Sequence, residues 1–594
     1  MYTNEKNCQK LIALLKSHNI RKIVASPGST NISLVTSMQN DSYFEMYSSV
    51  DERSAAYLAC GLAAESGEPV ALSCTGATAS RNYMSGLTEA YYRKLPILAI
   101  TSHQGREKIG HLIAQNLDRT IIPNDIVTLS VEVPNCIDEE TEWYADIQIN
   151  KALLELRRHG GGPVHINLIT TYSRNFDVPE LPPTRVIRRI CPGDTIPEIP
   201  EGNVAIFVGS HKKMTLEETE AIERFCETYN AVVFCDHTSG YYGKYKLNYS
   251  LVFAQQVLIS KNTKFDTLIH IGEVSGDYFS LWIGNLATQV WRVSEDGEIR
   301  DTFRKLSHVF ETKELDFFEA YAAQKTQEHA KFQIYQNEYE HLLTLIPELP
   351  FSNLWIAKNF APMLPKNSVI HFGILNSLRA WNMFELPSGI TSYSNVGGFG
   401  IDGCVSSLIG AALASPDKLF FGIVGDLAFF YDLNSLGNRH LPSNLRLILI
   451  NNGKGQEFRN STHTAFAFGD KADAYIAAGG HFGNKSEHLV RHYAQNLGMT
   501  YITANNKETA LNNAPAFFNE NRKLKPVLFE IFTNSADETQ ALDMIQHLIS
   551  EEDLEKYRRS VNHARIMEHL SFGKKRKHYI EKKLRAENIL KKSR

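Results

Sequence analysis

The sequence predicts an α/β protein with three doubly wound, parallel-sheet domains and a basic helical tail. Its 594 residues exceed what one core supports, and strand and helix patterns alternate from the start of the chain to about residue 540. A proline cluster at residues 173–203 interrupts the alternation as a linker would. We expect domains at residues 1–175, 190–335 and 350–540, followed by a helical, basic extension at 541–594.

In the first domain, apolar strand patterns are followed by turns and by helix-forming segments. The expected helices cover residues 8–18, 54–65 and 80–93, and the expected strands cover 22–25, 44–48, 70–74, 97–101 and 164–168. In a doubly wound sheet, ligands bind at the carboxyl ends of the strands. We therefore expect the functional residues of this domain in the loops that follow its strands.

The other two domains repeat the pattern. Strands are expected at 204–208, 232–235, 267–271 and 289–293, a helical stretch at 316–346, and further strands from 369–372 to 527–532. From Gly573 on, ten Lys or Arg residues stand against Glu581 and Glu587. A solvated extension is the favoured interpretation of this tail, and a basic anchor for a membrane surface or a polyanion is the alternative.

Composition and charge narrow the class of protein. The chain is 43% hydrophobic and 22% charged with a net charge of −4, so nothing indicates nucleic acid as a partner. Eight scattered cysteines without a Cys-x-x-Cys pair are typical of reduced, mostly buried thiols. With no signal peptide and no apolar run of membrane-spanning length, we expect a cytoplasmic protein.

Two segments in the third domain indicate a metal site. Gly425-Asp426-Leu427 closes one apolar strand, and Asn451-Asn452-Gly453-Lys454 closes the next one along the chain. Because a parallel sheet puts both strand ends on one edge, Asp426 and Asn452 should converge. Carboxylate, amide and carbonyl oxygens suit Mg²⁺, or Ca²⁺ or Mn²⁺, bridging a diphosphate.

This pair of segments, with its spacing, resembles the signature of the thiamin-diphosphate enzymes. Asp51-Glu52-Arg53, which follows a strand, is similar to the catalytic-glutamate segment of that superfamily. The resemblance implies that Glu52 hydrogen-bonds N1′ of the aminopyrimidine and stabilises the imino tautomer that activates the cofactor. It also implies domains that bind the pyrimidine (first) and the diphosphate (third), with sites shared between the subunits of a homodimer or homotetramer.

Further motifs resemble one branch of the superfamily, the menaquinone-pathway synthase that decarboxylates 2-oxoglutarate and adds the product to isochorismate. They are Ala25-Ser26-Pro27-Gly28-Ser29, Asn376-Ser377-Leu378, Ser394-Asn395, Gly400-Ile401-Asp402-Gly403, Tyr431-Asp432-Leu433-Asn434 and Gly455-Gln456. The leucine after Gly-Asp is characteristic of that branch.

Position by position, the resemblance implies a set of cofactor and metal contacts. Asp426, Asn452 and the carbonyl of Lys454 should hold the metal ion. Ile401 should be the apolar wedge that bends the cofactor. The other cofactor contacts should come from Gly425, Leu427, Asn376, Ser377, Gly400, Gln456 and Asn452.

The substrate side departs from that branch. The family's arginines, which bind carboxylates bidentately, are replaced by Thr30, Gln104, Trp381 and Val396. Arg379 and Arg106 are close in sequence and could compensate for single losses. Because a buried carboxylate without partners costs several kcal/mol, the four replacements together predict that this chain does not run the menaquinone reaction.

The remaining candidate substrate residues are neutral or aromatic apart from one carboxylate. They are Ser29, Thr30, His103, Gln104, Gln115, Trp381, Glu457 and Phe458, and Glu457 takes a position that is apolar in the family. His103 is either an acid–base group that titrates near neutrality or a hydrogen-bonded structural histidine. Arg81 is either an anion contact or an exposed residue at a helix start.

These residues predict an enzyme that decarboxylates a 2-oxo acid, such as pyruvate, and transfers the carbanion equivalent to a polyhydroxylated or nucleotide-linked carbonyl acceptor. A simple 2-oxo acid decarboxylase or a C–C hydrolase is the nearest alternative. An alternative of another class is a non-catalytic scaffold with the same fold.

Overall fold

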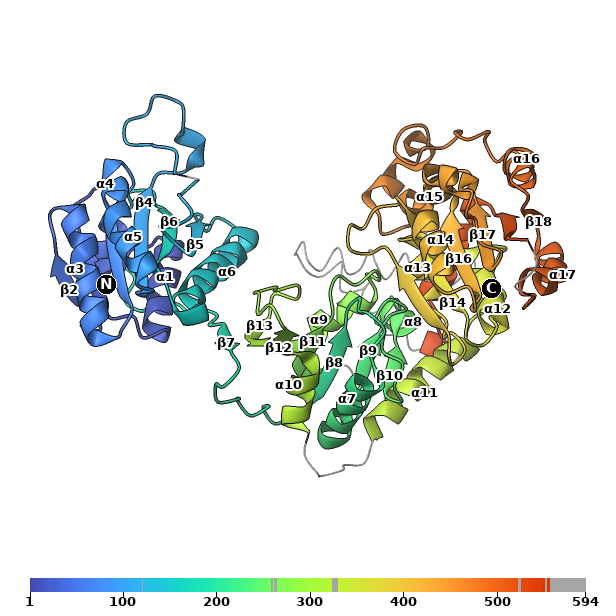
Figure 1. Ribbon diagram of the computed structural model, residues 1–594, viewed down its shortest axis with the longest axis horizontal. Helices are drawn as coiled ribbons and strands as arrows, with labels where there is room; N and C mark the ends of the chain where they lie inside the picture. The colour runs from blue at the N-terminus through green and yellow to red at the C-terminus, as the bar shows by residue number, and fades with distance from the viewer. Residues whose placement is uncertain are drawn as a thin grey trace. The chain divides into compact units, whose positions relative to one another are not determined.

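Parallel strands and covering helices make up the protein, as the alternation in its sequence predicts. The computed structural model describes residues 1–119, 121–257, 260, 264–322, 330–521, 525–550 and 553–555. It separates into two compact units, which are Met1–Ile196 with Asp296–Glu311 (unit 1), and Pro197–Glu295 with the described residues from Thr312 on (unit 2) (Figure 1). The predicted basic tail lies outside the described residues, and the division into three domains stays a prediction.

Unit 1 is built on a six-stranded sheet in the order β2-β1-β3-β4-β6-β5, with all neighbours parallel. Its strands are β1 (Lys22–Ala25), β2 (Glu45–Ser48), β3 (Val70–Thr75), β4 (Ile97–His103), β5 (Leu129–Val133) and β6 (Val164–Ile169). One face packs against α1 (Lys6–Ser17), α2 (Ile32–Gln39) and α6 (Glu139–Glu155). The other face packs against α3 (Glu52–Ser66), α4 (Thr78–Asn82) and α5 (Met84–Tyr92).

The predicted helices and strands of unit 1 are present, but α2, α6 and β5 were not predicted, and one expected helix is divided. The single helix expected over residues 80–93 is divided into α4 and α5 at Tyr83, whose ring is fully buried between α3 and the sheet. The edge strand β5 was not predicted, although its five residues alternate apolar side chains with Ser and Glu as a half-buried strand does.

Unit 2 contains two groups of parallel strands. Five strands take the order β10-β9-β8-β11-β12, with β8 (Val204–Val208), β9 (Val233–Cys235), β10 (Lys246–Asn248), β11 (Phe265–Ile271) and β12 (Ala287–Ser294). Six more take the order β15-β14-β16-β17-β19-β18, with β14 (Val369–Phe372), β15 (Thr391–Ser394), β16 (Phe420–Gly425), β17 (Leu445–Asn451), β18 (Thr500–Ala504) and β19 (Val527–Phe532).

Helices surround these strands. They are α7 (Leu216–Tyr229), α8 (Ser250–Phe253), α9 (Ile283–Leu286), α10 (Glu314–Tyr321), α11 (Ala330–Thr344), α12 (Asn353–Phe360), α13 (Asn376–Trp381), α14 (Cys404–Ala414), α15 (Asp426–Tyr431), α16 (Leu489–Asn496), α17 (Lys507–Phe517) and α18 (Ser535–Gln546). The helical stretch expected at 316–346 falls on α10 and α11. Strands β14 and β19 have the predicted bounds.

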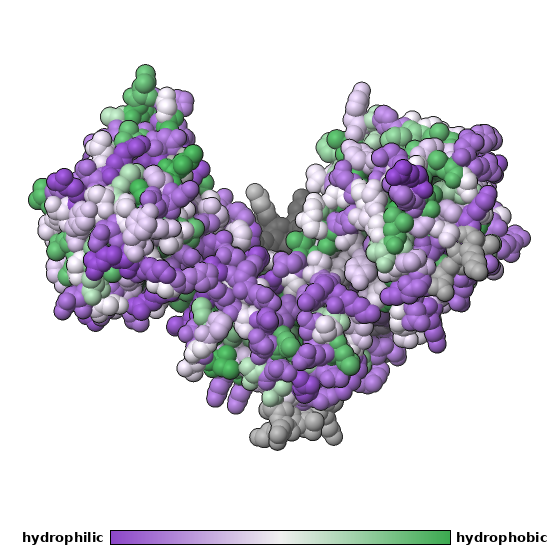
Figure 2. All heavy atoms as spheres, in the orientation of Figure 1, coloured by the Kyte–Doolittle hydropathy of each residue, from purple (hydrophilic) through white to green (hydrophobic). Residues whose placement is uncertain are grey.

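Apolar side chains reach the surface of unit 1 at several places (Figure 2). Val50 precedes α3, and Tyr57 and Leu58 lie on it, whereas Leu112 and Ile121 belong to the loop after β4; all five are exposed. Exposed apolar groups gathered on one element are typical of an interaction surface. In the part of the chain that is described, no helix is both long and apolar enough to cross a membrane.

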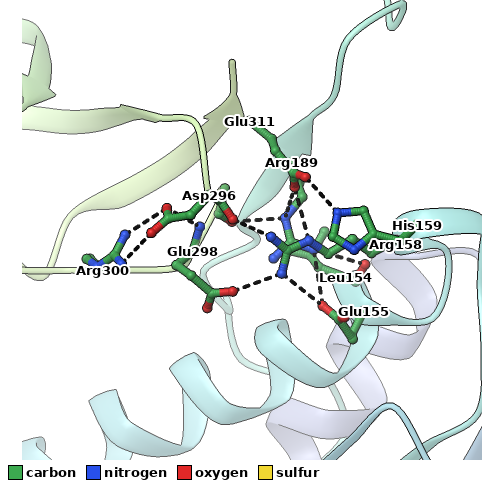
Figure 3. Close-up of polar contacts among 10 residues, drawn as sticks. Leu154, Glu155, Arg158, His159, Arg189, Asp296, Glu298, Arg300 and Glu311 are labelled. Atoms are coloured by element: carbon green, nitrogen blue, oxygen red, sulfur yellow. Dashed lines mark hydrogen bonds and ion pairs between the residues drawn. The ribbon is translucent and has the colours of Figure 1, made fainter. Parts of the chain in front are cut away.

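Residues 296–311 belong to unit 1, and an ion-pair network holds them against the rest of this unit (Figure 3). The Arg158 guanidinium lies 3.0 Å from Glu311 Oε2 and 2.9 Å from Glu298 Oε1. Arg189 donates to the carbonyl oxygens of Gly297 and Leu154. Strand β13 (Leu306–Glu311), which ends in Glu311, pairs in parallel with β7 (Arg188–Ile190). A segment more than a hundred residues away in sequence thus completes this unit.

Candidate functional site

The two segments of the predicted metal site lie side by side in unit 2. Strands β16 and β17 pair in parallel, with Gly425 opposite Ile450. Asp426 is the first residue of α15, and Asn452 directly follows β17. The amide of Gly453 donates to Asp426 Oδ2 at 2.6 Å, and the amide of Leu427 donates to Oδ1 at 2.8 Å. The convergence expected from the parallel sheet is therefore present.

The Asp426 carboxylate is suited to a bound cation. Its residue is only 5% exposed, and burial raises the pKa of the carboxyl group to about 6 despite the hydrogen bonds from backbone amides. Among the described residues, no Lys or Arg nitrogen lies within ion-pair distance of it. A divalent ion would compensate this buried charge, and Asn452 Oδ1 and the Lys454 carbonyl are oxygens of the hard kind that Mg²⁺ prefers.

Two residues beside this loop were missed by the sequence analysis. The Asp473 carboxylate accepts hydrogen bonds from Lys454 Nζ, at 2.6 Å, and from the Arg459 guanidinium. It thus holds both ends of the stretch 454–459, which follows β17. Lys485 packs its aliphatic chain against Gly453 and donates from Nζ to the carbonyl oxygen of Thr533. Both come from loop segments without apolar periodicity, and no sequence signal ties them to the metal loop.

Of the two glycines expected at the cofactor, only Gly425 borders open space. A Cβ on Gly425 would meet nothing within 4 Å, as is true of the neighbouring loop residues Gly397 and Gly398, whereas a Cβ on Gly400 would lie 2.5 Å from the Asp402 carboxylate. Ile401 is half-buried and packs on the core that contains β16 and α14. A Cβ on Gly455 would lie 2.9 Å from the Phe458 ring and 3.3 Å from Leu427, so these three residues form one wall. The surroundings fit a bound diphosphate cofactor.

Asn376, Ser377 and Gln456 are held in place by neighbouring helices. Asn376 begins α13, and Ser377 is buried behind it. The Gln456 amide donates to the Ser535 carbonyl oxygen and to Thr539, and it accepts from the Ser535 hydroxyl at 2.6 Å. Gln456 thus connects the metal loop to the start of α18. The roles of these three residues toward the cofactor stay predictions.

Glu538 of α18 is fully buried behind the site and predicts a pH dependence of stability. Its carboxylate accepts from the Asn353 amide and the Thr533 hydroxyl. Burial raises its pKa from 4.5 to about 7. The folded state therefore holds this proton more tightly than the unfolded state does, so stability falls as the pH rises from about 4.5 to about 7.

We expect Glu538→Gln to remove this dependence. Between about pH 4.5 and 7, the wild type should lose about 3 kcal/mol of unfolding free energy that the Gln variant keeps. Urea denaturation of both proteins at several pH values in this range measures the difference. An identical pH dependence of the two proteins would contradict the assignment.

Glu52 lies at the start of α3 in unit 1. Asp51 caps this helix by accepting from the Ser54 amide at 2.8 Å, which fixes the backbone at Glu52. The Glu52 carboxylate is half-exposed, and the amide of Asn82 donates to it at 3.4 Å. A weakly held carboxylate at the surface of unit 1 is available to an external partner, as the predicted role requires.

The predicted substrate residues of unit 1 differ in accessibility. Thr30 is buried, and its hydroxyl lies 2.5 Å from the Ser102 carbonyl oxygen and from the Thr75 hydroxyl. Ser29 and Gln115 are exposed, and Gln104 is half-buried and accepts from Lys108. Burial and two nearby arginines lower the pKa of His103 to about 4, so it is neutral near pH 7 and the structural alternative is the one supported.

Arg119 is a further, half-buried cation that the sequence did not single out. Its guanidinium donates to Thr101 Oγ1 at 2.8 Å and to Asn167 Oδ1 at 2.5 Å. Burial lowers its pKa to about 10. Gly76 packs against the Arg119 guanidinium: a side-chain Cβ at residue 76 would lie only 2.8 Å from Arg119 Nη2. Arg81, considered as an anion contact, is exposed and donates to the Asp118 carbonyl oxygen.

Two positions at which the sequence resemblance implies that arginines are replaced, Trp381 and Val396, are buried in unit 2. Trp381 is fully buried, and its indole nitrogen donates to Asn353 Oδ1 at 3.3 Å. Val396 is 3% exposed, and a Cβ on Gly276 would lie 2.6 Å from its Cγ1. A substrate role for Trp381 stays a prediction that its burial does not support.

Comparisons with known proteins place this geometry in a family. A family model described as thiamine pyrophosphate enzyme, N-terminal TPP binding domain, matches residues 7–122. The chain is 30% identical over 567 residues to the 2-succinyl-5-enolpyruvyl-6-hydroxy-3-cyclohexene-1-carboxylate synthase of Bacteroides fragilis, with 92% of this chain and 99% of that protein covered. The chain belongs to this synthase family. The synthase of Bacteroides thetaiotaomicron is 29% identical, with 93% and 100% covered, and that of Flavobacterium johnsoniae is 27% identical, with 88% and 95% covered.

Membership of the synthase family confirms the resemblance stated above and the reaction class. The chain is an enzyme that uses thiamin diphosphate with a divalent metal ion. It decarboxylates a 2-oxo acid and transfers the carbanion equivalent to an acceptor. The alternative of a non-catalytic scaffold is thereby set aside.

Proposed function

We propose that the donor of this synthase is a 2-oxo acid with a single carboxylate, such as pyruvate. The observation that carries the proposal is the state of the two arginines that could replace the lost ones. Arg379 forms an ion pair with Glu457 at 2.6 Å, and Arg106 forms one with Glu132 at 2.7 Å. The Arg379 pair is largely shielded from water, so this guanidinium is not free to receive a second substrate carboxylate. Arg106 is 58% exposed, and it lies at the surface of unit 1 with Glu132 as its partner.

The acceptor is proposed to be a polar carbonyl compound, polyhydroxylated or linked to a nucleotide. Unit 2 contains a cleft of about 760 Å³ whose walls include Asn395, Thr238, His211 and Lys212. Hydroxyl, amide and charged groups in one wall favour a ligand that is rich in hydrogen-bonding groups. Residues 394–397, which precede Gly400 and Ile401 in the chain, also line this cleft.

The residues act in three ways in the proposed mechanism. Asp426, Asn452 and the Lys454 carbonyl would hold the metal ion, which we take to be Mg²⁺, together with the diphosphate group. Glu52 would hold a proton in a hydrogen bond to the aminopyrimidine ring. Leu427, Phe458 and Ile401 exclude water from the reacting centre. Bound thiamin diphosphate supplies the nucleophile and the electron sink for loss of CO₂.

We propose that two copies of the chain form the functional enzyme, as a homodimer or a dimer of dimers. The exposed Val50, Tyr57 and Leu58 at α3 support a partner there, since Glu52 begins the same helix. A partner over this surface would remove water from Glu52, which the proton-holding role of its carboxylate needs.

Product analysis tests the proposed function. Purified full-length protein with thiamin diphosphate and Mg²⁺ is given isotope-labelled pyruvate and a panel of carbonyl acceptors, with 2-oxoglutarate and isochorismate as the alternative pair. We expect labelled CO₂ and a product in which the remaining carbons of pyruvate are joined to an acceptor. Free acetaldehyde or acetate alone would favour the simple decarboxylase or hydrolase, and turnover restricted to 2-oxoglutarate with isochorismate would contradict the proposed donor.

A further inference from the structure

A buried ion pair lies next to the predicted cofactor residues of unit 2. Arg379 belongs to α13, and Glu457 lies in the short helix Gln456–Arg459 that follows the metal loop. Arg379 Nη1 is 2.6 Å from Glu457 Oε2, and Nη2 is 3.3 Å from Oε1. The two side chains are 8% and 19% exposed. Each terminal nitrogen of the guanidinium thus donates to one carboxylate oxygen, the two-point geometry that arginine uses for carboxylate ligands.

The neighbours of the pair keep it at the edge of the site. The amide of Asn376, in the orientation that satisfies both contacts, donates to Glu457 Oε2 at 3.3 Å and accepts from the Glu457 amide at 2.7 Å. Asn460 also donates to Glu457 Oε2, at 2.9 Å. The Arg379 guanidinium lies over the rings of Tyr278 and Phe279, at 5.3 Å and 5.9 Å from the ring centroids.

This environment makes Arg379 a preorganised receptor for a carboxylate. Two aromatic rings and its own helix fix the guanidinium, so little conformational entropy remains to be lost on binding a ligand. Glu457 fills that receptor from within the protein. A donor with a second carboxylate would have to displace Glu457 and leave it buried without its cation, which is unfavourable.

We propose that Glu457 is a specificity-determining residue that occupies Arg379 and so restricts the donor to 2-oxo acids with a single carboxylate. This inference rests on the proposed function, because it explains why a dicarboxylic donor is rejected. The site would discriminate against donors with two carboxylates because the Glu457 carboxylate occupies the position at which the second carboxylate of the donor would bind. Removing that carboxylate should turn the same arginine into an attractive contact.

The test compares Glu457→Leu and Glu457→Gln with the wild-type holoenzyme. We measure kcat/KM for pyruvate and for 2-oxoglutarate, and we measure glutarate binding by calorimetry. The ratio of 2-oxoglutarate to pyruvate should rise by about tenfold or more in the Leu variant, mainly through KM, and by less in the Gln variant. Glutarate should bind the Leu variant more tightly than the wild type.

The double variant Glu457→Leu/Arg379→Leu is the matched control, because it removes the receptor together with its occupant. It should show neither the higher ratio nor the tighter glutarate binding. Glu385→Leu removes the carboxylate of a different pair in the same unit, with Lys246, and should leave the ratio unchanged.

Two results would overturn the inference. One is an unchanged donor ratio with unchanged glutarate binding in both single variants, and the other is the same gain in the double variant. Should Glu457→Leu fail to fold, the Gln variant, which keeps the side-chain shape, decides alone. If the wild type decarboxylates no 2-oxo acid, the proposed function fails, and the glutarate titration still decides whether Glu457 blocks Arg379.

Discussion

Replacing Glu52 with glutamine is expected to lower kcat for CO₂ release by about 10²–10⁴-fold, the range for a lost acid–base group. An amide cannot hold the proton that a carboxylate shares with a ring nitrogen. The fold should not change, since Glu52 is half-exposed and, within the described part of the chain, its carboxylate accepts one long hydrogen bond, from Asn82 at 3.4 Å. The measurement is CO₂ release from pyruvate at saturating cofactor, together with the melting temperature.

Glu65→Gln is the matched control for this substitution, because Glu65 is exposed near the other end of α3. It should keep wild-type activity. A Glu52→Gln variant that retains full activity, while still binding thiamin diphosphate, would remove Glu52 from the mechanism.

The second large effect is expected at Asp426. In the wild type, thiamin diphosphate with Mg²⁺ at about 100 times the dissociation constant should raise the unfolding free energy by about 3 kcal/mol. Asp426→Asn should lose most of this gain, because an amide offers the metal ion one neutral oxygen in place of a buried carboxylate. Thermal melting with and without ligands, and with EDTA, measures the loss.

Asp417→Asn serves as the comparison, since Asp417 is exposed between α14 and β16. That variant should keep the full ligand-induced stabilisation. Equal stabilisation of the Asp426→Asn variant by thiamin diphosphate and Mg²⁺ would show that the metal ion binds elsewhere.

Most of the fold could be predicted from the sequence because its central strands are continuous apolar runs. Strands β1, β14 and β19 have the predicted bounds, and their residues are mostly buried. Several strands that the pattern failed to predict are short or lie at an edge, as β5, β7 and β10 do, whereas the missed β13 is neither. Short and edge strands need fewer apolar side chains, so their sequences resemble loops.

The site could be predicted only where residue type and spacing carry the chemistry. The convergence of Asp426 and Asn452 follows from one βαβ unit, and so it was visible in the sequence. The pairing of Arg379 with Glu457 joins residues 78 positions apart, and that of Lys454 with Asp473 joins a strand end to a loop. Pairs of this kind depend on tertiary packing, which local pattern does not encode.

Accessibility was the least predictable property. Thr30 and Trp381 occupy positions where the family has arginines, yet the side chains turn inward and bond to Ser102 and Asn353. A small hydroxyl or an indole can satisfy its hydrogen bonds inside the core, whereas a guanidinium seeks an anion or water. Residue type at these two positions therefore indicated the loss of charge, but it did not indicate that the side chains are buried.

The return of residues 296–311 to unit 1 affects how this chain can be made and divided. During synthesis, Met1–Ile196 is complete before Glu298 and Glu311 have been added to the chain. The ion pairs of Arg158 with these two residues can therefore form only after about a hundred further residues have been synthesised. A fragment that stops at Ile196 would expose β7 as an unpaired edge and retain a guanidinium without those partners. For expression of unit 1 alone, the useful boundary is therefore a spliced one, in which the 296–311 segment is attached through a linker after Ile196.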